Sequence, residues 1–185
     1  MFSLFVRLVR GAPRLPAGRR PPLAPDERVV AWASADDDSA GRPQTVVVTN
    51  LGLWLPGEPR LAWHLIHKVV WSGRQLAVTP AEVVEERDGY DVVADRPPRT
   101  YQLLAPDDVP EQVRARVTGS VAYTQSHPAP GGGRVRVVAR RVRGVDGLTW
   151  AVRADAGVDV DSAAAREALG TLVERARAQL PGTAG

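Results

Sequence analysis

The chain has 185 residues, 44% of them hydrophobic, and a formal net charge of +3. This length fits one ordinary domain, and no stretch approaches the roughly 20 apolar residues that span a bilayer. The chain contains no cysteine, which excludes disulfides, iron–sulfur clusters and thiol catalysis and is typical of a reducing compartment. The sequence therefore predicts a cytoplasmic protein without a transmembrane segment.

The first 25 residues carry the basic balance of the chain. They contain five arginines and no acid, together with many Pro and Gly residues, so that no helix or strand can continue through them. We therefore expect residues 1–25 to be a disordered basic tail and residues 26–181 to form a single domain. Two alternatives stay open. The tail could be a mitochondrial presequence in a eukaryote, or it could make a peripheral membrane contact through Phe2, Phe5 and Leu8.

Short segments of alternating polar and apolar residues follow, separated by turn residues. These predicted strands cover 29–34, 45–49, 53–55, 60–71, 75–79, 90–94 and 100–104. The segment 60–71 alternates most clearly and is predicted as one long half-buried strand, or two strands joined by a bulge. Such a run of short strands at even spacing is typical of a β-sandwich or barrel.

Two helices are expected after these strands. Asp108 and Pro110 are typical of a helix start, and this middle helix should be short because residues 117–125 again alternate like a strand. Strands at 117–125, 135–143 and 148–154 would form a meander. A helical apolar stripe then predicts a C-terminal amphipathic helix, capped by Asp161 or Ser162 and stopped by Pro181 and Gly182. The stripe consists of Ala165, Leu169, Leu172, Val173, Ala176 and Leu180. The expected fold class is α+β, mainly an antiparallel sandwich or barrel with these two helices.

The order of these elements resembles the bacterial pleckstrin-homology-like (PH-like) domain. The resemblance rests on VVVTNLGLWLP (46–56), RLAWHLIHKVVW (60–71) and RQLAV (74–78), followed by the strand pair at 90–104 and the helix from 108. The segments RVTGSVAY (116–123) and VRVVARR (135–141) are similar to a group of uncharacterised actinobacterial proteins that contain this domain. The resemblance implies no enzyme activity. The strands and the helix after residue 117 exceed a minimal domain of this kind, so they would extend the sheet or form a subdomain.

The polar clusters do not match known metal or catalytic motifs. Asp36, Asp37 and Asp38 are followed by Ala40 and Val47 where an EF-hand calcium loop needs oxygen ligands, so a solvated turn is expected. This acidic loop also argues against lipid-headgroup binding. His64 and His67 would point to opposite faces of a strand and could not share a metal. No hydrolase or phosphate-loop motif occurs. We therefore expect no enzyme, no metal and no cofactor.

The five tryptophans lie in predicted strands, at Trp32, Trp54, Trp63, Trp71 and Trp150. Core packing is the first interpretation, because aromatic residues favour strands. A ligand groove lined by Trp54 or Trp71 is the alternative.

The candidate binding site is an arginine-rich hairpin. No acid occurs between Glu111 and Asp146, and strand alternation would place Arg134, Arg136 and Arg140 on one exposed face. Arg141 and Arg143 complete the predicted partner-binding residues. A surface of this kind suits an acidic protein or another anionic partner, and the function predicted here is a non-catalytic interaction module. The alternatives are a nucleic-acid-binding accessory protein and a solvated face without a partner.

Overall fold

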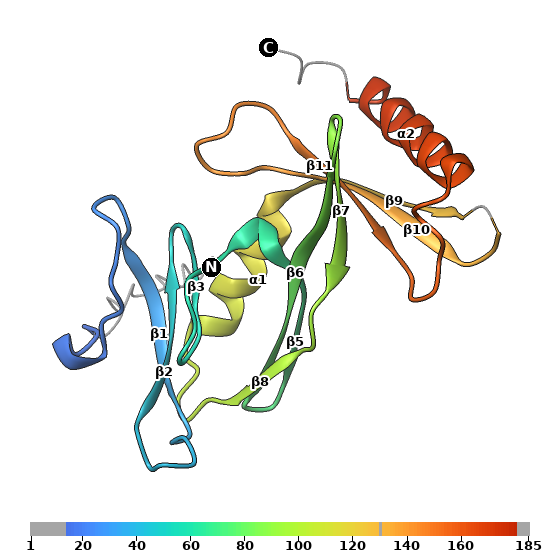
Figure 1. The fold of residues 1–185 in the computed structure, drawn as a ribbon. Coiled ribbons are helices and arrows are strands. Elements are labelled where there is room, and N and C mark those ends of the chain that lie inside the picture. Colours follow the sequence, from blue (N-terminus) through green and yellow to red (C-terminus); the bar gives the residue numbers. More distant parts are fainter. Residues whose placement is uncertain (1–13, 130, 181–185) are drawn as a thin grey trace, which may run out of the picture.

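The described part of the chain forms two β-sheets and two α-helices (Figure 1). The computed structural model describes residues 14–129 and 131–180. A four-stranded antiparallel sheet contains β1 (Val29–Ala35), β2 (Gln44–Thr49), β3 (Gly52–Trp54) and β4 (Leu61–Ala62). A seven-stranded sheet has the order β5 (Ile66–Ser72), β6 (Gln75–Arg87), β7 (Tyr90–Asp95), β11 (Thr149–Ala154), β10 (Arg134–Arg140) and β9 (Val121–Pro128), with β8 (Arg99–Gln102) paired to β6.

The long strand β6 connects the two halves of the molecule. Its first part pairs with β5 and β8, and its second part, from Ala81 to Arg87, pairs with β7, with an irregularity in the register between Val83 and Glu85. Strand β7 then pairs with β11 in parallel, whereas the other strand pairs are antiparallel. The C-terminal meander therefore extends the sheet. Residues 80–87, for which the sequence predicted no strand, belong to β6 because the β7 backbone satisfies their hydrogen bonds.

The segment 60–71 is not one continuous strand. A single 3₁₀ turn, η2 (Trp63–Leu65), separates β4 from β5. Trp63 and Ile66 lie three residues apart and are both buried, which a turn permits and a strand does not. The prediction of a single alternating strand is wrong because the chain turns here from the first sheet to the second.

Helix α1 (Val109–Ser120) lies between the two sheets, which curl around it as a half-barrel (Figure 1). Val109 and Val113 are fully buried in a core shared with both sheets, and Val117 continues the same helical face. The prediction that a strand begins at residue 117 is therefore wrong. The helix ends at Ser120, and β9 follows directly.

Helix α2 (Ala163–Ala178) packs on β10 and β11. The Ser162 hydroxyl accepts a hydrogen bond from the backbone N–H of Ala165 at 3.2 Å, which confirms Ser162 as the cap. Leu169 and Val173 are buried, and Leu172 is half-buried. The predicted stop at residues 181 and 182 lies outside the described residues. Neither helix in the described part of the chain has the length and apolar character needed to cross a membrane.

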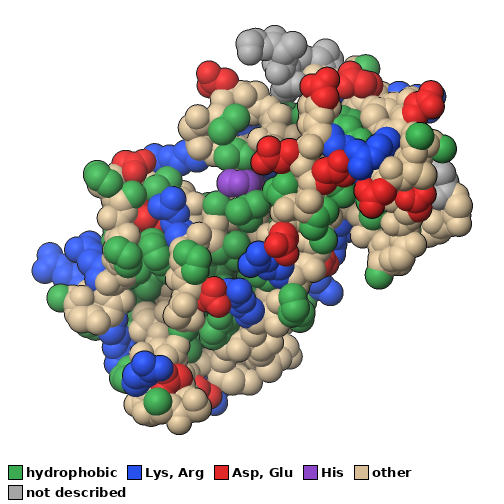
Figure 2. All heavy atoms as spheres, viewed as in Figure 1, with side chains coloured by type: hydrophobic (Ala, Val, Ile, Leu, Met, Phe, Trp, Pro, Cys, Tyr) green, Lys and Arg blue, Asp and Glu red, His purple; other side chains and the backbone are tan. Residues whose placement is uncertain are grey.

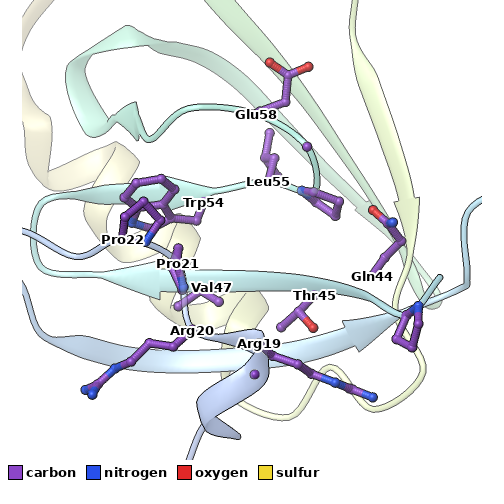
Figure 3. A pocket seen from close by; sticks show the side chains of 14 residues that line it. Arg19, Arg20, Pro21, Pro22, Gln44, Thr45, Val47, Trp54, Leu55 and Glu58 are labelled. Carbon is purple, nitrogen blue, oxygen red and sulfur yellow. The ribbon is translucent and has the colours of Figure 1, made fainter.

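Residues 14–25, which the sequence assigns to a tail, contact the outer face of the first sheet. They include the 3₁₀ turn η1 (Ala17–Arg19), and the Arg19 guanidinium donates to the Ser34 hydroxyl at 2.8 Å. Pro21 lies over Val47, which points away from the core yet is only 1% exposed (Figure 3). Residues 1–13 of the predicted tail lie outside the described residues.

The α+β class and the mostly antiparallel sheets agree with the sequence prediction. The structure also contains the expected middle helix and the C-terminal amphipathic helix. The finer assignment to the PH-like fold stays a prediction.

Candidate functional site

The arginines of the predicted hairpin do not form one surface. Alternation along β10 exposes Arg134 and Arg136, as predicted, while Val135 and Val137 face α2. Arg140 lies on the same side of the strand as Arg134 but is only 9% exposed. The prediction that Arg140 belongs to the exposed surface is wrong, because the far end of β10 runs beneath the half-barrel.

Arg140 is held there by two hydrogen bonds. Its guanidinium donates to the Ser120 hydroxyl at 2.8 Å and to the Ile66 carbonyl at 3.1 Å. Within residues 14–129 and 131–180, no carboxylate lies within ion-pair distance of it. Burial, with a smaller contribution from Arg153, lowers the pKa of Arg140, although it stays charged at neutral pH. Arg140 is therefore a buried positive charge that has no ion-pair partner among the described residues.

Arg141 and Arg143 lie beyond the end of β10, in the loop that leads to β11, and face a cleft of about 730 Å³. Arg60, from the link between β3 and β4, and Arg116, from α1, line the same cleft. We call this site the arginine cleft and define it by these four arginines. Figure 2 shows the molecule hollowed between the loop before β1 and the β10–β11 loop, with basic side chains at the rim. Among the described residues, Asp26 is the single carboxylate in the lining.

Arg141 holds the end of helix α1 against the β10–β11 loop. Its backbone N–H donates to the Ser120 carbonyl at 2.8 Å, and its guanidinium donates to the carbonyls of Gly119 and Val121 at 3.3 and 3.4 Å. A cation at this place also compensates the negative end of the helix dipole. These contacts fix the arginine at the mouth of the cleft.

Arg116 lies over an aromatic ring on the other wall. Its guanidinium carbon is 6.0 Å from the centre of the Trp63 ring, and one nitrogen donates to the Gln112 side chain at 2.6 Å. Burial lowers the pKa of Arg116. The indole N–H of Trp63 is buried and has no hydrogen-bond partner among the described residues.

The remaining two arginines have acidic partners of different kinds. Arg60 donates to the buried Glu27 carboxylate at 2.8 Å, but its own side chain keeps one third of its surface exposed. Arg143 reaches Asp26 only at 3.5 Å, and both side chains are more than half exposed. Such an exposed pair contributes little and is easily exchanged for another anion. Arg143 is the cation of the cleft that a ligand could recruit most easily.

The histidines do not supply a metal site. His64 lies on η2 and lines the arginine cleft, while His67 lies on β5, where its Nδ1 contacts the Asp95 carboxylate at 2.6 Å. Burial and the nearby Arg140 lower the pKa of His64, so that it is neutral at pH 7. No group of three His, Asp or Glu residues within the described chain could hold a metal ion. The cleft thus offers hydrogen-bond donors and positive charge, which suit a phosphate or carboxylate ligand.

The Trp54 alternative corresponds to a second hollow, of about 350 Å³, on the outer face of the first sheet. Figure 3 shows Pro22 beside the Trp54 ring, with Arg20 pointing away. The indole N–H of Trp54 donates to Glu27 at 2.8 Å. The chain's own residues 18–22 border this hollow. Its lining residues therefore mainly pack against one another.

The predicted turn after β1 is confirmed. The Asp38 carboxylate accepts hydrogen bonds from the backbone N–H groups of Ala40 and Arg42, both at 2.9 Å. These bonds lower the pKa of Asp38. The carboxylate of Asp38 therefore binds donors of its own loop, as expected for the predicted solvated turn.

Comparison with protein-family models, with curated proteins and with solved structures found no match to this chain. The candidate site therefore rests on geometry alone. Sequence reasoning included Arg141 and Arg143 among the partner-binding residues but not Arg60 or Arg116, although Arg116 lies in the same acid-free region of the sequence. These two come from separate segments, and no local pattern links them to the hairpin.

Proposed function

We propose that this protein is a non-catalytic interaction module of PH-like architecture that binds an anionic partner in the arginine cleft. The ligand chemistry is a phosphate or carboxylate group presented by an acidic protein. The observation that carries the proposal is the convergence of four arginines, from three separate segments, on one cleft whose described lining contains a single carboxylate.

The charges around the cleft support this proposal. Bringing arginines together in a partly desolvated hollow is unfavourable unless anions compensate them. Among the described residues, Glu27 compensates Arg60 and Asp26 reaches Arg143 only weakly, while Arg116 and Arg141 have no ion-pair partner. Arg140 adds a further positive charge behind Ser120, which forms part of the cleft wall. An anion in the cleft would therefore be attracted chiefly by Arg116, Arg140 and Arg141, whose charges no ion pair within the described residues compensates.

The chemistry of the lining favours binding over catalysis. Its polar side chains are mainly donors, and the neutral His64 has no hydrogen bond to an acid of the described residues that could orient it. The resemblance to PH-like domains points in the same direction, because it implies no enzyme activity. These arguments favour binding as the function of the cleft.

The proposal is tested by measuring how the full chain binds a fluorescent poly-glutamate peptide at increasing salt concentration. The double variant Arg116→Gln and Arg143→Gln is compared with the double variant Arg134→Gln and Arg136→Gln, which removes the same charge from exposed β10. We expect the cleft variant to weaken binding by at least about tenfold, since a charge-assisted hydrogen bond contributes about 1.5–3 kcal/mol. The β10 variant should bind like the wild type.

The opposite pattern would assign binding to the exposed face of β10 and overturn the cleft. A single-stranded oligonucleotide serves as the second probe. Tighter binding of the oligonucleotide than of the peptide, with a steep salt dependence that both double variants reduce, would establish the nucleic-acid alternative instead.

A further inference from the structure

A second groove lies on the other side of α1, between this helix and strand β5. It measures about 760 Å³ and shares no lining residue with the arginine cleft. Its floor is apolar and half-buried, formed by Val69 and Trp71 of β5 and by Pro110 and Val117 of α1. A groove with an apolar floor, open to solvent along its length, suits the side chains of a bound polypeptide.

Strand β5 is an edge of the seven-stranded sheet. Within the described part of the chain it pairs only with β6. Ser72 and Gln75 close a hairpin with two residues between them, so this pair exchanges backbone hydrogen bonds. Antiparallel pairs alternate between bonded and non-bonded. Val70 and Lys68 are therefore also bonded to β6.

The two residues between these bonded positions are Val69 and Trp71. Their backbone N–H and C=O groups point away from β6, toward the free edge of the sheet. The same two residues contribute their side chains to the groove floor. The groove thus combines unpaired backbone groups with apolar side-chain sites, which is what an added strand requires.

The rim of the groove is mainly basic. Lys68 projects from β5 and Arg114 from α1, and both side chains are exposed, while Glu111 is the single acid of the lining. Lys68 is also the only lysine of the chain. Lys68 alternates with Val69 and Trp71, so its side chain projects from the opposite face of β5, whereas Arg114 lies on the α1 side of the groove. A strand added to β5 would therefore bring its outward side chains near Lys68 and its side chains at the α1 rim near Arg114. Acidic side chains at those positions would be favoured over basic ones.

We propose that the groove between β5 and α1 binds an extended, acidic segment of a partner protein as an additional strand of the sheet. The backbone of the segment pairs with Val69 and Trp71, and alternate apolar side chains enter the groove. Acidic side chains on the outward face of the segment lie near Lys68, and an acidic side chain at the α1 rim lies near Arg114. This site is separate from the arginine cleft, and the proposal does not depend on the function of that cleft.

The test begins with selection of phage-displayed random peptides on the full chain. We expect enriched peptides in which apolar residues alternate and acids recur between them. A synthetic copy of one such peptide should slow the amide hydrogen exchange of Val69 and Trp71, measured by NMR, and leave that of Val70 unchanged. This pattern is specific to strand addition, because only the outward amides gain a hydrogen bond.

Two charge-reversal variants provide the matched control. The double variant Lys68→Glu and Arg114→Glu should bind the synthetic peptide with an affinity lower by roughly tenfold or more. Both side chains are exposed, so the fold should be retained. The double variant Arg134→Glu and Arg136→Glu makes the same change of charge on β10 and should bind normally. The cleft variant Arg116→Gln with Arg143→Gln should also bind normally, which separates this proposal from the proposed function.

Three results would overturn the proposal. One is a selection that enriches no peptide, and another is a bound peptide that leaves the exchange of Val69 and Trp71 unchanged. The third is binding that occurs only in a chain lacking residues 1–13, which would assign the groove to the protein's own N-terminal segment.

Discussion

The buried carboxylate of Glu27 offers the sharpest test of how the first sheet is held together. Its side chain is fully buried and accepts hydrogen bonds from the Thr49 hydroxyl, the Trp54 indole and the Arg60 guanidinium at 2.6, 2.8 and 2.8 Å. A fourth bond comes from the backbone N–H of Ala24 at 3.1 Å. This carboxylate joins the segment before β1 to β2, β3 and the β3–β4 link.

The variant Glu27→Gln keeps the shape of the side chain but removes its charge and one of its two acceptor oxygens. One amide oxygen can keep about two of the four donors, so the other two lose their partner. Breaking a buried ion pair costs about 3–5 kcal/mol, and the partial exposure of Arg60 reduces this cost because water can solvate that cation. We expect a loss of about 2–4 kcal/mol in the free energy of unfolding.

Chemical denaturation by urea, followed by tryptophan fluorescence, measures this loss. For a chain of this size it corresponds to a fall in melting temperature of roughly 4–16 °C, at about 2–4 °C for each kcal/mol. The control is Glu82→Gln, because Glu82 pairs with Arg96 on the surface, where nearly half of each side chain is exposed. It should unfold like the wild type. Equal effects of the two substitutions would refute the role given to Glu27.

The pH dependence gives a second readout of the same carboxylate. Burial by itself raises the pKa of Glu27, but the hydrogen bonds from Thr49, Trp54, Ala24 and Arg60 outweigh it and hold the pKa below its ordinary value of 4.5. Its contribution to stability is therefore complete above about pH 4.5 and is lost as the pH falls toward the lower folded-state value. The stability difference between wild type and Glu27→Gln should shrink below about pH 4.5. A difference that stays constant down to pH 3 would contradict the lowered pKa.

Two further predictions concern the C-terminal half. Leu169→Ala empties a fully buried site under α2 and should lower the free energy of unfolding by about 2–5 kcal/mol. Leu172→Ala, at a half-buried position, should lower it by less than half as much. Urea denaturation compares the two variants, and equal losses would mean that α2 packs in another orientation. Arg140→Ala should cost about 1–3 kcal/mol because two buried hydrogen bonds are lost, while Arg134→Ala should stay within about 0.5 kcal/mol in the same assay. An Arg140 variant as stable as the Arg134 variant would place Arg140 on the surface.

The sequence determined the features that depend on neighbouring residues. The alternation in 29–34, 45–49 and 75–79 identified strands, and the apolar stripe with its Ser162 cap identified α2, because backbone geometry repeats every two or 3.6 residues. The same reasoning failed at residues 117–120. An alternation over four residues is compatible with a strand and with a helix. Only the packing of Val117 against the core around α1 shows that these residues are helical.

Only the tertiary structure decided which arginines form a site. Alternation correctly gave Arg134 and Arg140 the same side of β10, but it cannot say what covers that side. The parallel pairing of β7 with β11 brings the end of β10 beneath the half-barrel, where Arg140 becomes buried. The arginine cleft likewise requires Arg60, Arg116 and Arg143 to meet from distant segments. Burial and convergence depend on contacts between residues far apart in the chain, and a local pattern carries no information about them.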